Sequence, residues 1–443
     1  MTSILGRFPA VLVLLSLADA GLVPEAGAMP DEPVKVEVVR TARGYALERG
    51  GRPYRIQGVG GLERLALLAE SGGNSIRTWS VGTPEQSARE LLDEAHRLGL
   101  TVALCLDIAR ERHGFDYDDD AAVAAQFERA RADVLAHRNH PALLAWIIGN
   151  ELNHDFKNPR VYDAVNEISR MIHEIDGNHP TTTTIAGFSA DMAEVISARA
   201  PDIDFLSIQS YAGVLDLQRR VRKAGYEGPY VLTEWGPPGH WEVATTSWGA
   251  PIEPDSSAKA KALRRAHATA IEPYPDQLIG NYVFLWGQKQ ERTPTWYGLF
   301  TETGERTESV DVMQHLWTGA WPSNRSPAVR SVRLDGRRAG RDIVLVPGQT
   351  YPILARVRDP EGDALRYRWS VKSESRARQV GGDLEGAIAD VDGLIDEPSS
   401  SRAQLTAPEE PGAYRVFVYA YDGNGGAAHA NVPFLVRSPA GAD

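Results

Sequence analysis

Hydrophobic positions follow two alternating periods over residues 34–320, and this alternation predicts the fold of the first part of the chain. Short apolar and β-branched runs, typical of buried strands, alternate with segments that carry an apolar residue every three to four positions, typical of helices. After a small hairpin, strands are expected at residues 54–58, 74–79, 100–107, 141–148, 181–186, 205–211, 230–234 and 280–286. Eight strands alternating with helices predict a (β/α)8 TIM barrel.

The segments between these strands carry recognisable helix start and stop residues. Thr83, followed by Pro84, is expected to cap the helix that Gly99 ends. An open doubly wound sheet is the main structural alternative. The glycines at residues 58–61 after the first strand lack the spacing of a phosphate-binding loop, so the barrel is favoured.

The pattern changes at residues 321–328, which contain prolines and serines and which we interpret as a linker. Beyond it, short alternating strands separated by turns predict an all-β immunoglobulin-like sandwich over residues 329–437. These strands are expected at residues 329–334, 343–346, 351–357, 365–371, 403–405, 413–421 and 430–436. The second domain therefore follows the barrel in the chain.

Two acidic turns stand between sandwich strands, at residues 359–363 (Asp-Pro-Glu-Gly-Asp) and 421–425 (Tyr-Asp-Gly-Asn-Gly). Asp, Asn, Pro and Gly favour turns without any ligand. Carboxylates in such turns can also hold calcium. Because acidic turns are common without a metal, the sequence alone favours turns and no metal site.

The N-terminus has the pattern of a secretory signal peptide over residues 1–28. Arg7 precedes an apolar run at residues 10–18 that is short for a membrane span, and small residues follow it. An uncleaved anchor helix is the alternative. No later segment approaches the length of a membrane span. Cys105 is the only cysteine, so no intrachain disulfide can form. We therefore expect a periplasmic or secreted protein that is stabilised by its core.

Composition and charge limit the class of partner. With 42% apolar and 24% charged residues, the chain of 443 residues is typical of a soluble globular protein. Its net charge of −12 disfavours nucleic acid and anionic membrane surfaces, which would repel it. The charge says little about a neutral ligand, and nothing in the sequence defines the oligomeric state.

The ends of the predicted barrel strands carry the candidate chemistry, because these ends face one shared cavity in a TIM barrel. Two of the residues there are glutamates, Glu151 and Glu234, which could act as acid and nucleophile. The remaining arginine, amide, phenol and indole groups could bind sugar hydroxyls or stack on sugar rings. These candidate substrate-binding residues are Arg77, Trp79, Asn150, Gln209, Tyr211, Trp235 and Trp286. The long loop at residues 236–255 adds Trp241 and Trp248 as further stacking candidates.

Two of these segments also carry a family resemblance. Residues 137–141, continuing through Trp146 to Gly149-Asn150-Glu151, together with residues 233–236, resemble the TIM-barrel domain of glycoside hydrolase family 2 and, more broadly, clan A. The resemblance covers roughly residues 34–320. It implies that Glu151 is the general acid/base and Glu234 the nucleophile. It also implies that Asn150 bonds the sugar 2-hydroxyl, that Tyr211 touches the nucleophile and that Arg77 lies beneath it.

The domain order differs from that family. Family 2 enzymes usually carry a jelly-roll and an immunoglobulin-like domain before the barrel, whereas here the sandwich pattern follows the barrel. Such front domains often shape an exo-acting pocket. The resemblance therefore does not extend to β-galactosidase or β-glucuronidase specificity, and an open groove for internal cleavage or glycosyl transfer is an equal alternative.

The predicted function is that of an exported retaining glycoside hydrolase that acts on a β-linked oligo- or polysaccharide through two glutamates and without a cofactor. Arg77 and Tyr211 should keep Glu234 ionised, and burial should raise the pKa of Glu151. A transglycosylase acting on a β-glucan is one alternative. A noncatalytic polysaccharide-binding or envelope protein is another. The sequence leaves open the glycan, the linkage and the role of the sandwich.

Overall fold

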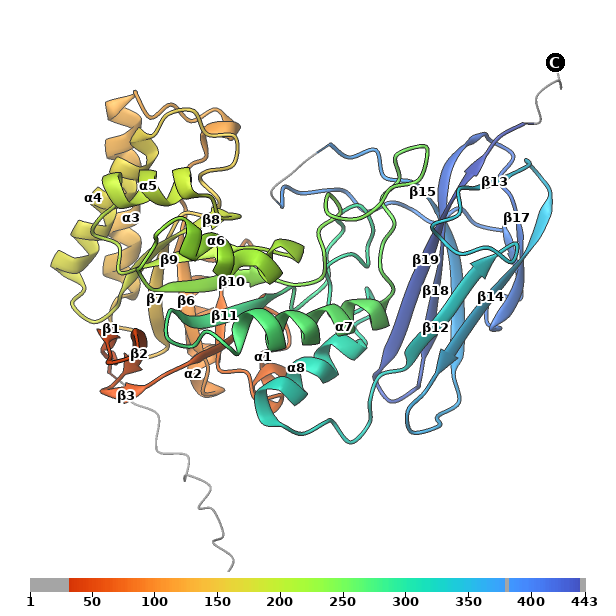
Figure 1. Cartoon of the computed structure of the whole chain (residues 1–443), viewed down its shortest axis with the longest axis horizontal. Coiled ribbons are helices and arrows are strands. Elements are labelled where there is room, and N and C mark those ends of the chain that lie inside the picture. The colour runs from red at the N-terminus through yellow and green to blue at the C-terminus, as the bar shows by residue number, and fades with distance from the viewer. Residues whose placement is uncertain (1–31, 379–381, 439–443) are drawn as a thin grey trace, which may run out of the picture.

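The computed structural model describes residues 32–378 and 382–438, so the predicted signal peptide lies outside the described residues. Two domains stand side by side, an α/β domain at the left of Figure 1 and an all-β domain at its right. The last barrel helix, α8 (Glu308–Thr318), and the first sandwich strand, β12 (Ala328–Leu334), lie on either side of the segment that joins the two domains.

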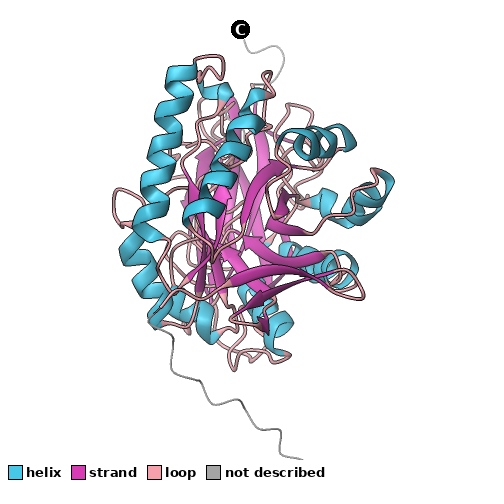
Figure 2. Cartoon of the chain, turned by 90° about the vertical axis from the view of Figure 1, so that its left-hand side faces the viewer, coloured by secondary structure: helices cyan, strands magenta, loops and turns pink. Residues whose placement is uncertain are grey.

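The first domain is a barrel of eight parallel strands, viewed with its surrounding helices in Figure 2. Each strand pairs with its neighbours in chain order, and the last strand pairs with the first. This closed arrangement confirms the predicted (β/α)8 fold. The strands are β4 (Ile56–Gly60), β5 (Ser75–Arg77), β6 (Thr101–Leu106), β7 (Leu143–Ile148), β8 (Thr181–Ala186), β9 (Phe205–Gln209), β10 (Tyr230–Trp235) and β11 (Leu278–Phe284).

Helices cover the outside of the barrel and bury their apolar faces against it. They are α1 (Leu65–Glu70), α2 (Ala88–Arg97), α3 (Asp120–His137), α4 (Arg160–Ile175), α5 (Ala190–Arg199), α6 (Leu217–Lys223), α7 (Ser256–Ala266) and α8 (Glu308–Thr318). Single turns of 3₁₀ helix occur at η1 (Glu111–His113) and η2 (Ala212–Asp216), and a π-helical turn, η3 (His267–Ile271), extends α7.

Helix α2 begins later than the sequence signals predicted. Its N-cap is Ser87, whose Oγ accepts a hydrogen bond from Glu90 N (3.3 Å) while the Glu90 carboxylate accepts one from Ser87 N (2.9 Å). This reciprocal capping box satisfies two backbone donors at the start of the helix. Thr83 instead accepts from the backbone of Glu85 and Gln86, in a turn ahead of the helix.

Strands β7 and β8 place very different residues in the same buried layer. All six residues of β7 are apolar and buried, as its unbroken hydrophobic run predicts. The threonines of β8 are also fully buried, and their hydroxyls find partners. Thr183 Oγ1 donates to Ile148 O (2.8 Å) and Thr182 Oγ1 to Ser207 Oγ (3.0 Å). Burial of these polar groups is therefore compensated by hydrogen bonds.

A small antiparallel sheet closes the N-terminal end of the barrel. It consists of β1 (Val36–Arg40), β2 (Tyr45–Arg49) and β3 (Arg52–Pro53). Val36 and Leu47 pack with Ile56, at the start of β4, in one buried apolar cluster. The opposite end of the barrel is thereby left as the open one.

The second domain is a sandwich of two four-stranded sheets, as predicted. One sheet has the order β12-β14-β17-β16 and the other β13-β19-β18-β15. Their facing residues, Trp369 and Phe434 among them, form a separate core. The strands are β12 (Ala328–Leu334), β13 (Ile343–Leu345), β14 (Thr350–Arg358), β15 (Arg366–Ser373), β16 (Ile395–Asp396), β17 (Arg402–Thr406), β18 (Gly412–Tyr421) and β19 (Ala427–Val436).

Polar contacts join the two domains. Asn431 of β19 donates to Glu253 (2.6 Å), which lies in the loop before α7, and His429 N donates to Ser256 Oγ (3.1 Å). The described residues between β15 and β16 extend from the sandwich towards the barrel (Figure 1), where Asp383 pairs with Arg112 (2.6 Å). The sandwich therefore contacts the barrel through at least two separate segments.

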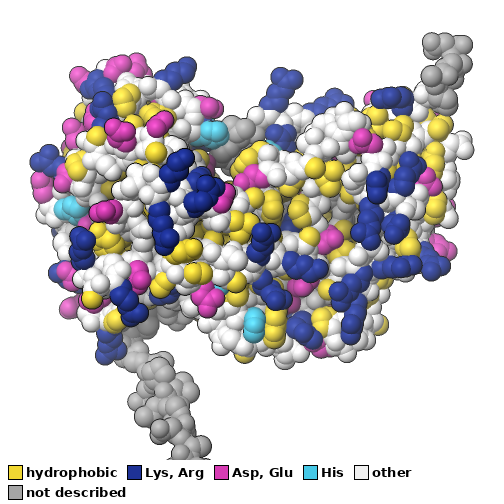
Figure 3. All heavy atoms as spheres, viewed as in Figure 1, with side chains coloured by type: hydrophobic (Ala, Val, Ile, Leu, Met, Phe, Trp, Pro, Cys, Tyr) yellow, Lys and Arg dark blue, Asp and Glu magenta, His cyan; other side chains and the backbone are white. Residues whose placement is uncertain are grey.

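The surface carries charges of both signs. Figure 3 shows Lys and Arg side chains interspersed with Asp and Glu over the face drawn. None of the helices in the described residues is long and apolar enough to cross a membrane.

Candidate active site

A cavity of about 340 Å³ opens at the C-terminal ends of the barrel strands. Five of the residues that line it were predicted from strand ends, and the others are Phe284 at the end of β11 and residues from loops of both domains. The lining residues are Trp79, Arg110, Asn150, Glu151, Tyr211, Glu234, Trp241, Phe284, Leu285, Lys289, Glu291, Gly382 and Asp383.

Glu234 lies near the end of β10, and its carboxylate is held by four side-chain donors. Oε1 accepts from Arg77 Nη1 (3.0 Å), Trp79 Nε1 (2.8 Å) and Gln209 Nε2 (3.0 Å). Oε2 accepts from the Tyr211 hydroxyl (2.7 Å). Hydrogen bonds and a cation of this kind stabilise a carboxylate in its charged form.

Burial keeps the Tyr211 hydroxyl protonated. The pKa of Tyr211 is raised well above its usual range, first by burial and then by the negative charge of Glu234. The phenol therefore remains a hydrogen-bond donor to Glu234 at neutral pH.

Arg77 and Gln209 lie beneath the cavity and connect Glu234 to Asn150. Arg77 is fully buried, and its Nη2 donates to Asn150 Oδ1 (2.8 Å). Gln209 Nε2 donates to the same oxygen (2.8 Å). Since Oδ1 is the acceptor of both bonds, the amide orientation of Asn150 is fixed and its Nδ2 hydrogens are left for a ligand.

Glu151 follows β7 in an unusual backbone conformation. Its φ is +51°, in the left-handed region, and Gly149 two residues earlier has φ +77°. The Glu151 N–H donates to Thr184 Oγ1 at the end of β8 (3.0 Å), which fixes this turn. The apolar strand thus ends in a sharp bend that presents the Glu151 side chain to the cavity.

Glu151 has an environment opposite to that of Glu234. It is partly exposed to the cavity, yet the cavity walls remove most of the water around it. This burial raises the pKa of Glu151 well above its usual range, and the negative charge of Glu234 raises it further. The positive charges of Arg77, Arg110 and Arg112 oppose the increase only in part. The site therefore favours a protonated Glu151 beside the Glu234 carboxyl group that four donors hold.

Not every predicted substrate-binding residue lies at the cavity. Trp79, Asn150 and Tyr211 line it, while Arg77 and Gln209 contact Glu234 from below. Trp235 is fully buried outside the cavity, where its Nε1 donates to Asn281 Oδ1 (2.9 Å). Trp286 is also fully buried and packs against Phe300, with ring centroids 5.1 Å apart.

Loop residues complete the walls of the cavity. Trp241, which the sequence analysis named as a stacking candidate, is 59% exposed and packs edge-on against Tyr211. Arg110 comes soon after β6, and its Nε donates to Asn150 O (3.0 Å). Its position a few residues beyond the end of that strand is a signal that could have marked it as a cavity residue. Lys289 pairs with Glu291 (2.8 Å) after β11. Gly382 and Asp383 belong to the sandwich, and no strand-end signal marks them.

Among the described residues, no group of metal-ligating side chains was found at the cavity. Within residues 32–378 and 382–438, the one group of acidic, histidine or cysteine side chains close enough to share a metal ion lies in the sandwich. The cavity brings together two carboxyl groups in different surroundings, with the side chains that hold Glu234.

Residues 90–239 match the family model of glycosyl hydrolases family 2, TIM barrel domain. The matched segment contains both glutamates together with Asn150, Gln209 and Tyr211. It confirms the resemblance that the segments ending at Glu151 and Gly236 carry, and it supports a glycoside hydrolase. No curated protein matches the chain significantly.

Solved structures with a similar fold include glycosidases. The structure of Bacteroides uniformis β-glucuronidase 2 bound covalently to cyclophellitol-6-carboxylate aziridine has 14% identity over 91% of this chain and 48% of that one, with a TM-score of 0.50. Bifidobacterium dentium β-glucuronidase has 17% identity over 65% of this chain and 49% of that one, with a TM-score of 0.48. A family 5 mannosidase from Rhizomucor miehei has 12% identity over 62% of this chain and 96% of that one, with a TM-score of 0.44. The chain spans about half the length of the two β-glucuronidases. Likeness at this level of identity concerns the fold alone.

Proposed function

We propose that this protein is a retaining glycoside hydrolase that cleaves a β-linked glycan by double displacement. The observation that carries the proposal is the contrast between its two cavity glutamates. Glu234 accepts hydrogen bonds from four side chains, one of them a buried arginine, whereas burial and a neighbouring charge raise the pKa of Glu151. A retaining mechanism requires this pairing of a charged nucleophile with a neutral acid.

In the first step, a Glu234 oxygen attacks the anomeric carbon while Glu151 gives its proton to the oxygen of the leaving sugar. The glycosidic bond breaks and a glycosyl ester forms on Glu234. The Glu151 carboxylate then takes a proton from water, whose oxygen attacks the same carbon and releases Glu234. Two inversions give net retention.

The cavity walls fit a sugar ring in that position. Trp79, Trp241 and Phe284 offer aromatic faces and edges, which pack against the C–H groups of sugars. Asn150 is held with its Nδ2 hydrogens available, which suits a hydrogen bond to the sugar 2-hydroxyl. The volume of about 340 Å³ falls within the range of roughly 300–1,000 Å³ of small-ligand sites.

The signal-like pattern of residues 1–28 supports a further part of the proposal, that the enzyme acts in the periplasm or outside the cell. A glycan substrate outside the cytoplasm would be consistent with this location.

The test is to determine the anomeric configuration of the first product and the roles of the two glutamates separately. A panel of β-linked oligosaccharides and aryl β-glycosides is offered to the wild type, and the first product is followed by ¹H NMR. We expect the β-anomer to form first. An α-anomer as first product would overturn the mechanism.

Chemical rescue assigns the roles. With an activated aryl β-glycoside and sodium azide, Glu234→Ala should yield the α-glycosyl azide, because azide replaces the nucleophile. Glu151→Ala should yield the β-glycosyl azide, because azide attacks the glycosyl-enzyme instead of water. Glu174→Gln, an exposed glutamate of α4, serves as matched control and should turn over like the wild type. Wild-type turnover in both cavity variants would refute the site.

A further inference from the structure

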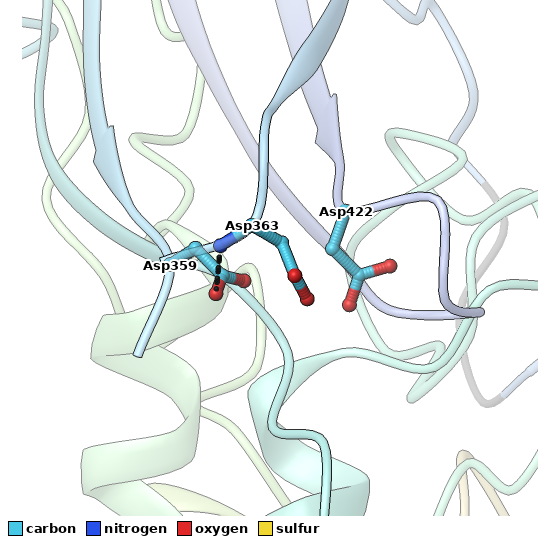
Figure 4. A group of neighbouring side chains, drawn as sticks. All are labelled: Asp359, Asp363 and Asp422. Atoms are coloured by element: carbon cyan, nitrogen blue, oxygen red, sulfur yellow. Dashed lines mark hydrogen bonds between the residues drawn. The ribbon is translucent and has the colours of Figure 1, made fainter. Parts of the chain in front are cut away.

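We propose that Asp359, Asp363 and Asp422 of the sandwich bind a calcium ion at the junction with the barrel. Figure 4 shows their carboxylates, two from the turn between β14 and β15 and one from the turn between β18 and β19. The proposal is independent of the glycosidase chemistry.

The spacing of the three carboxylates fits one calcium ion. Each offers an oxygen that lies within 4.8 Å of the oxygens offered by the other two. Two calcium–oxygen bonds of about 2.3–2.6 Å allow ligand atoms to be roughly this far apart. One cation at the centre could therefore contact all three without a large movement of the loops.

Asp359 supplies an acceptor that lacks a donor. Its side chain is buried, with 6% of its surface exposed, and its Oδ1 accepts from the backbone N–H groups of Glu361, Gly362 and Asp363 at 2.8–3.0 Å. Its Oδ2 is buried and has no hydrogen-bond partner. In Figure 4 this second oxygen is directed towards Asp363 and Asp422. Since a buried acceptor without a partner is destabilising, a cation at this position would satisfy it.

The charge of the cluster is not balanced by protein cations. Within the described residues, none of the three aspartates forms an ion pair with Lys, Arg or His. The nearby arginines are engaged elsewhere, Arg325 with Glu361 (2.9 Å) and Arg306 with Asp311 (3.2 Å). Asp422, 5% exposed, must therefore be buried beside two like charges. A divalent cation would remove this repulsion.

Two side-chain amides could complete the coordination. Asn324 Nδ2 donates to Asp422 Oδ2 and Asn424 Nδ2 to Asp363 Oδ2, both at 2.8 Å. Rotation of either amide about its last torsion brings its oxygen to the place of its nitrogen. Carboxylate and amide oxygens without His or Cys suit calcium rather than zinc. A flexible set of this size also suits calcium better than magnesium, which requires near-ideal octahedral geometry.

The site lies where the sandwich and the barrel touch. Arg306 N, just ahead of α8, donates to Gly425 O (3.0 Å), and Ala427 N donates back to Arg306 O (2.9 Å). Asn324 belongs to the segment that joins the two domains. Calcium bound to Asp422 would thus fix the β18–β19 turn against the barrel, and we expect it to stabilise the junction.

Isothermal titration of calcium chloride into the EDTA-treated full-length protein tests the proposal. The wild type should bind calcium, and Asp359→Asn and Asp363→Asn should each weaken this site by at least about tenfold, since calcium affinity follows the number of charged ligands. Asparagine keeps Oδ1 as an acceptor, so the turns should persist. Asp396→Asn, an exposed sandwich aspartate, is the matched control and should bind like the wild type.

Thermal unfolding supplies a readout that does not depend on the titration. Calcium should raise the unfolding midpoint of the wild type and of Asp396→Asn, but hardly that of Asp359→Asn or Asp363→Asn. The calcium assignment is overturned if the wild type binds no calcium, if magnesium binds more tightly, or if the two cluster variants bind calcium as well as the wild type does.

Discussion

Two glutamates, Glu234 and Glu253, are buried to nearly the same extent and accept a similar number of hydrogen bonds, yet their surroundings differ. Glu253 accepts from Lys259, from Thr293 Oγ1 (2.6 Å), from Thr295 Oγ1 (2.9 Å) and from Asn431 Nδ2 (2.6 Å). Its lysine is buried with it, and the group is sealed between the barrel and the sandwich. Glu234 instead faces a cavity that it shares with a second carboxyl group, Glu151.

The electrostatics of the two sites follow from this difference. Burial alone would raise the pKa of Glu253, but the positive charge of Lys259 and the hydrogen bonds lower it to about 2. Burial lowers the pKa of Lys259, and the negative charge of Glu253 opposes this by favouring the charged form of the lysine. We therefore treat Glu253 and Lys259 as an ion pair. Glu253 has a buried lysine as its partner, whereas Glu234 is paired with Arg77 and shares its cavity with a second carboxyl group, Glu151. A buried, fully hydrogen-bonded ion pair such as Glu253–Lys259 indicates a structural role. Two carboxyl groups that share a cavity, one with a strongly raised pKa, indicate a catalytic role.

The largest expected effect is on activity at Glu234. Glu234→Gln removes the proposed nucleophile but keeps the shape of the side chain, so kcat should fall by at least about 10⁴-fold. Steady-state assays on the best substrate of the panel, with circular dichroism to verify folding, measure it. Residual activity within tenfold of the wild type would remove the distinction between the two glutamates.

At Glu253 the expected effect is on stability. Glu253→Gln leaves the Lys259 ammonium buried without its counterion, which should destabilise the fold by about 3–5 kcal/mol, while kcat per folded molecule stays near that of the wild type. Urea unfolding followed by tryptophan fluorescence measures it. The double variant Glu253→Gln/Lys259→Met should recover much of the loss, because no unpaired charge remains. A Glu253→Gln protein as stable as the wild type would contradict the assigned role.

A smaller effect is expected from one hydrogen bond to Glu234. Tyr211→Phe removes the donor to Oε2, and hydrogen bonds to charged groups contribute about 1.5–3 kcal/mol. Negative charge returns to Glu234 as the glycosyl ester breaks in the second step, so loss of this bond should lower kcat by roughly 10- to 150-fold. Tyr226→Phe, at a tyrosine outside the cavity, is the control. A fall in Tyr211→Phe no larger than in this control would show that Tyr211 is dispensable.

The smallest effect is a shift of the pH profile. Glu151 must be protonated to act as acid, so kcat/KM should be high below its raised pKa and fall as pH rises through it. Arg110 lowers the pKa of Glu151 by its positive charge. Arg110→Gln should therefore move this basic limb to higher pH. Rate profiles of the two proteins between pH 4 and pH 10 test the shift, and a limb that moves to lower pH would contradict it.

The residues at the strand ends could be predicted from the sequence, because the hydrophobic runs locate the strands and the C-terminal ends of barrel strands face the cavity. The apolar run of β7 and the count of strands located Glu151 and Glu234, and the same rule located Arg77 and Gln209. Side-chain direction could have been used further. Side chains alternate across a strand, so Trp235 faces away from the cavity that Glu234 faces.

Other parts of the site depend on contacts between distant segments. Asp383 reaches the cavity from the sandwich through its pairing with Arg112, and nothing near residue 383 marks it as part of the site.

The start of α2 at Ser87 rather than Thr83 was decided by a local competition between two possible caps. The aspartate cluster likewise exists only because β14 and β18, which belong to different sheets, finish at the same end of the sandwich.

The backbone at Glu151 has a consequence for how this sequence can change. A left-handed conformation is strained for a residue with a Cβ atom, by roughly 1 kcal/mol, and glycine adopts it freely. Glu151→Gly should therefore be more stable than Glu151→Ala, although both lack the acid. In the proposed mechanism the acid would thus hold its place at the expense of stability, a trade between activity and stability that is common at active sites.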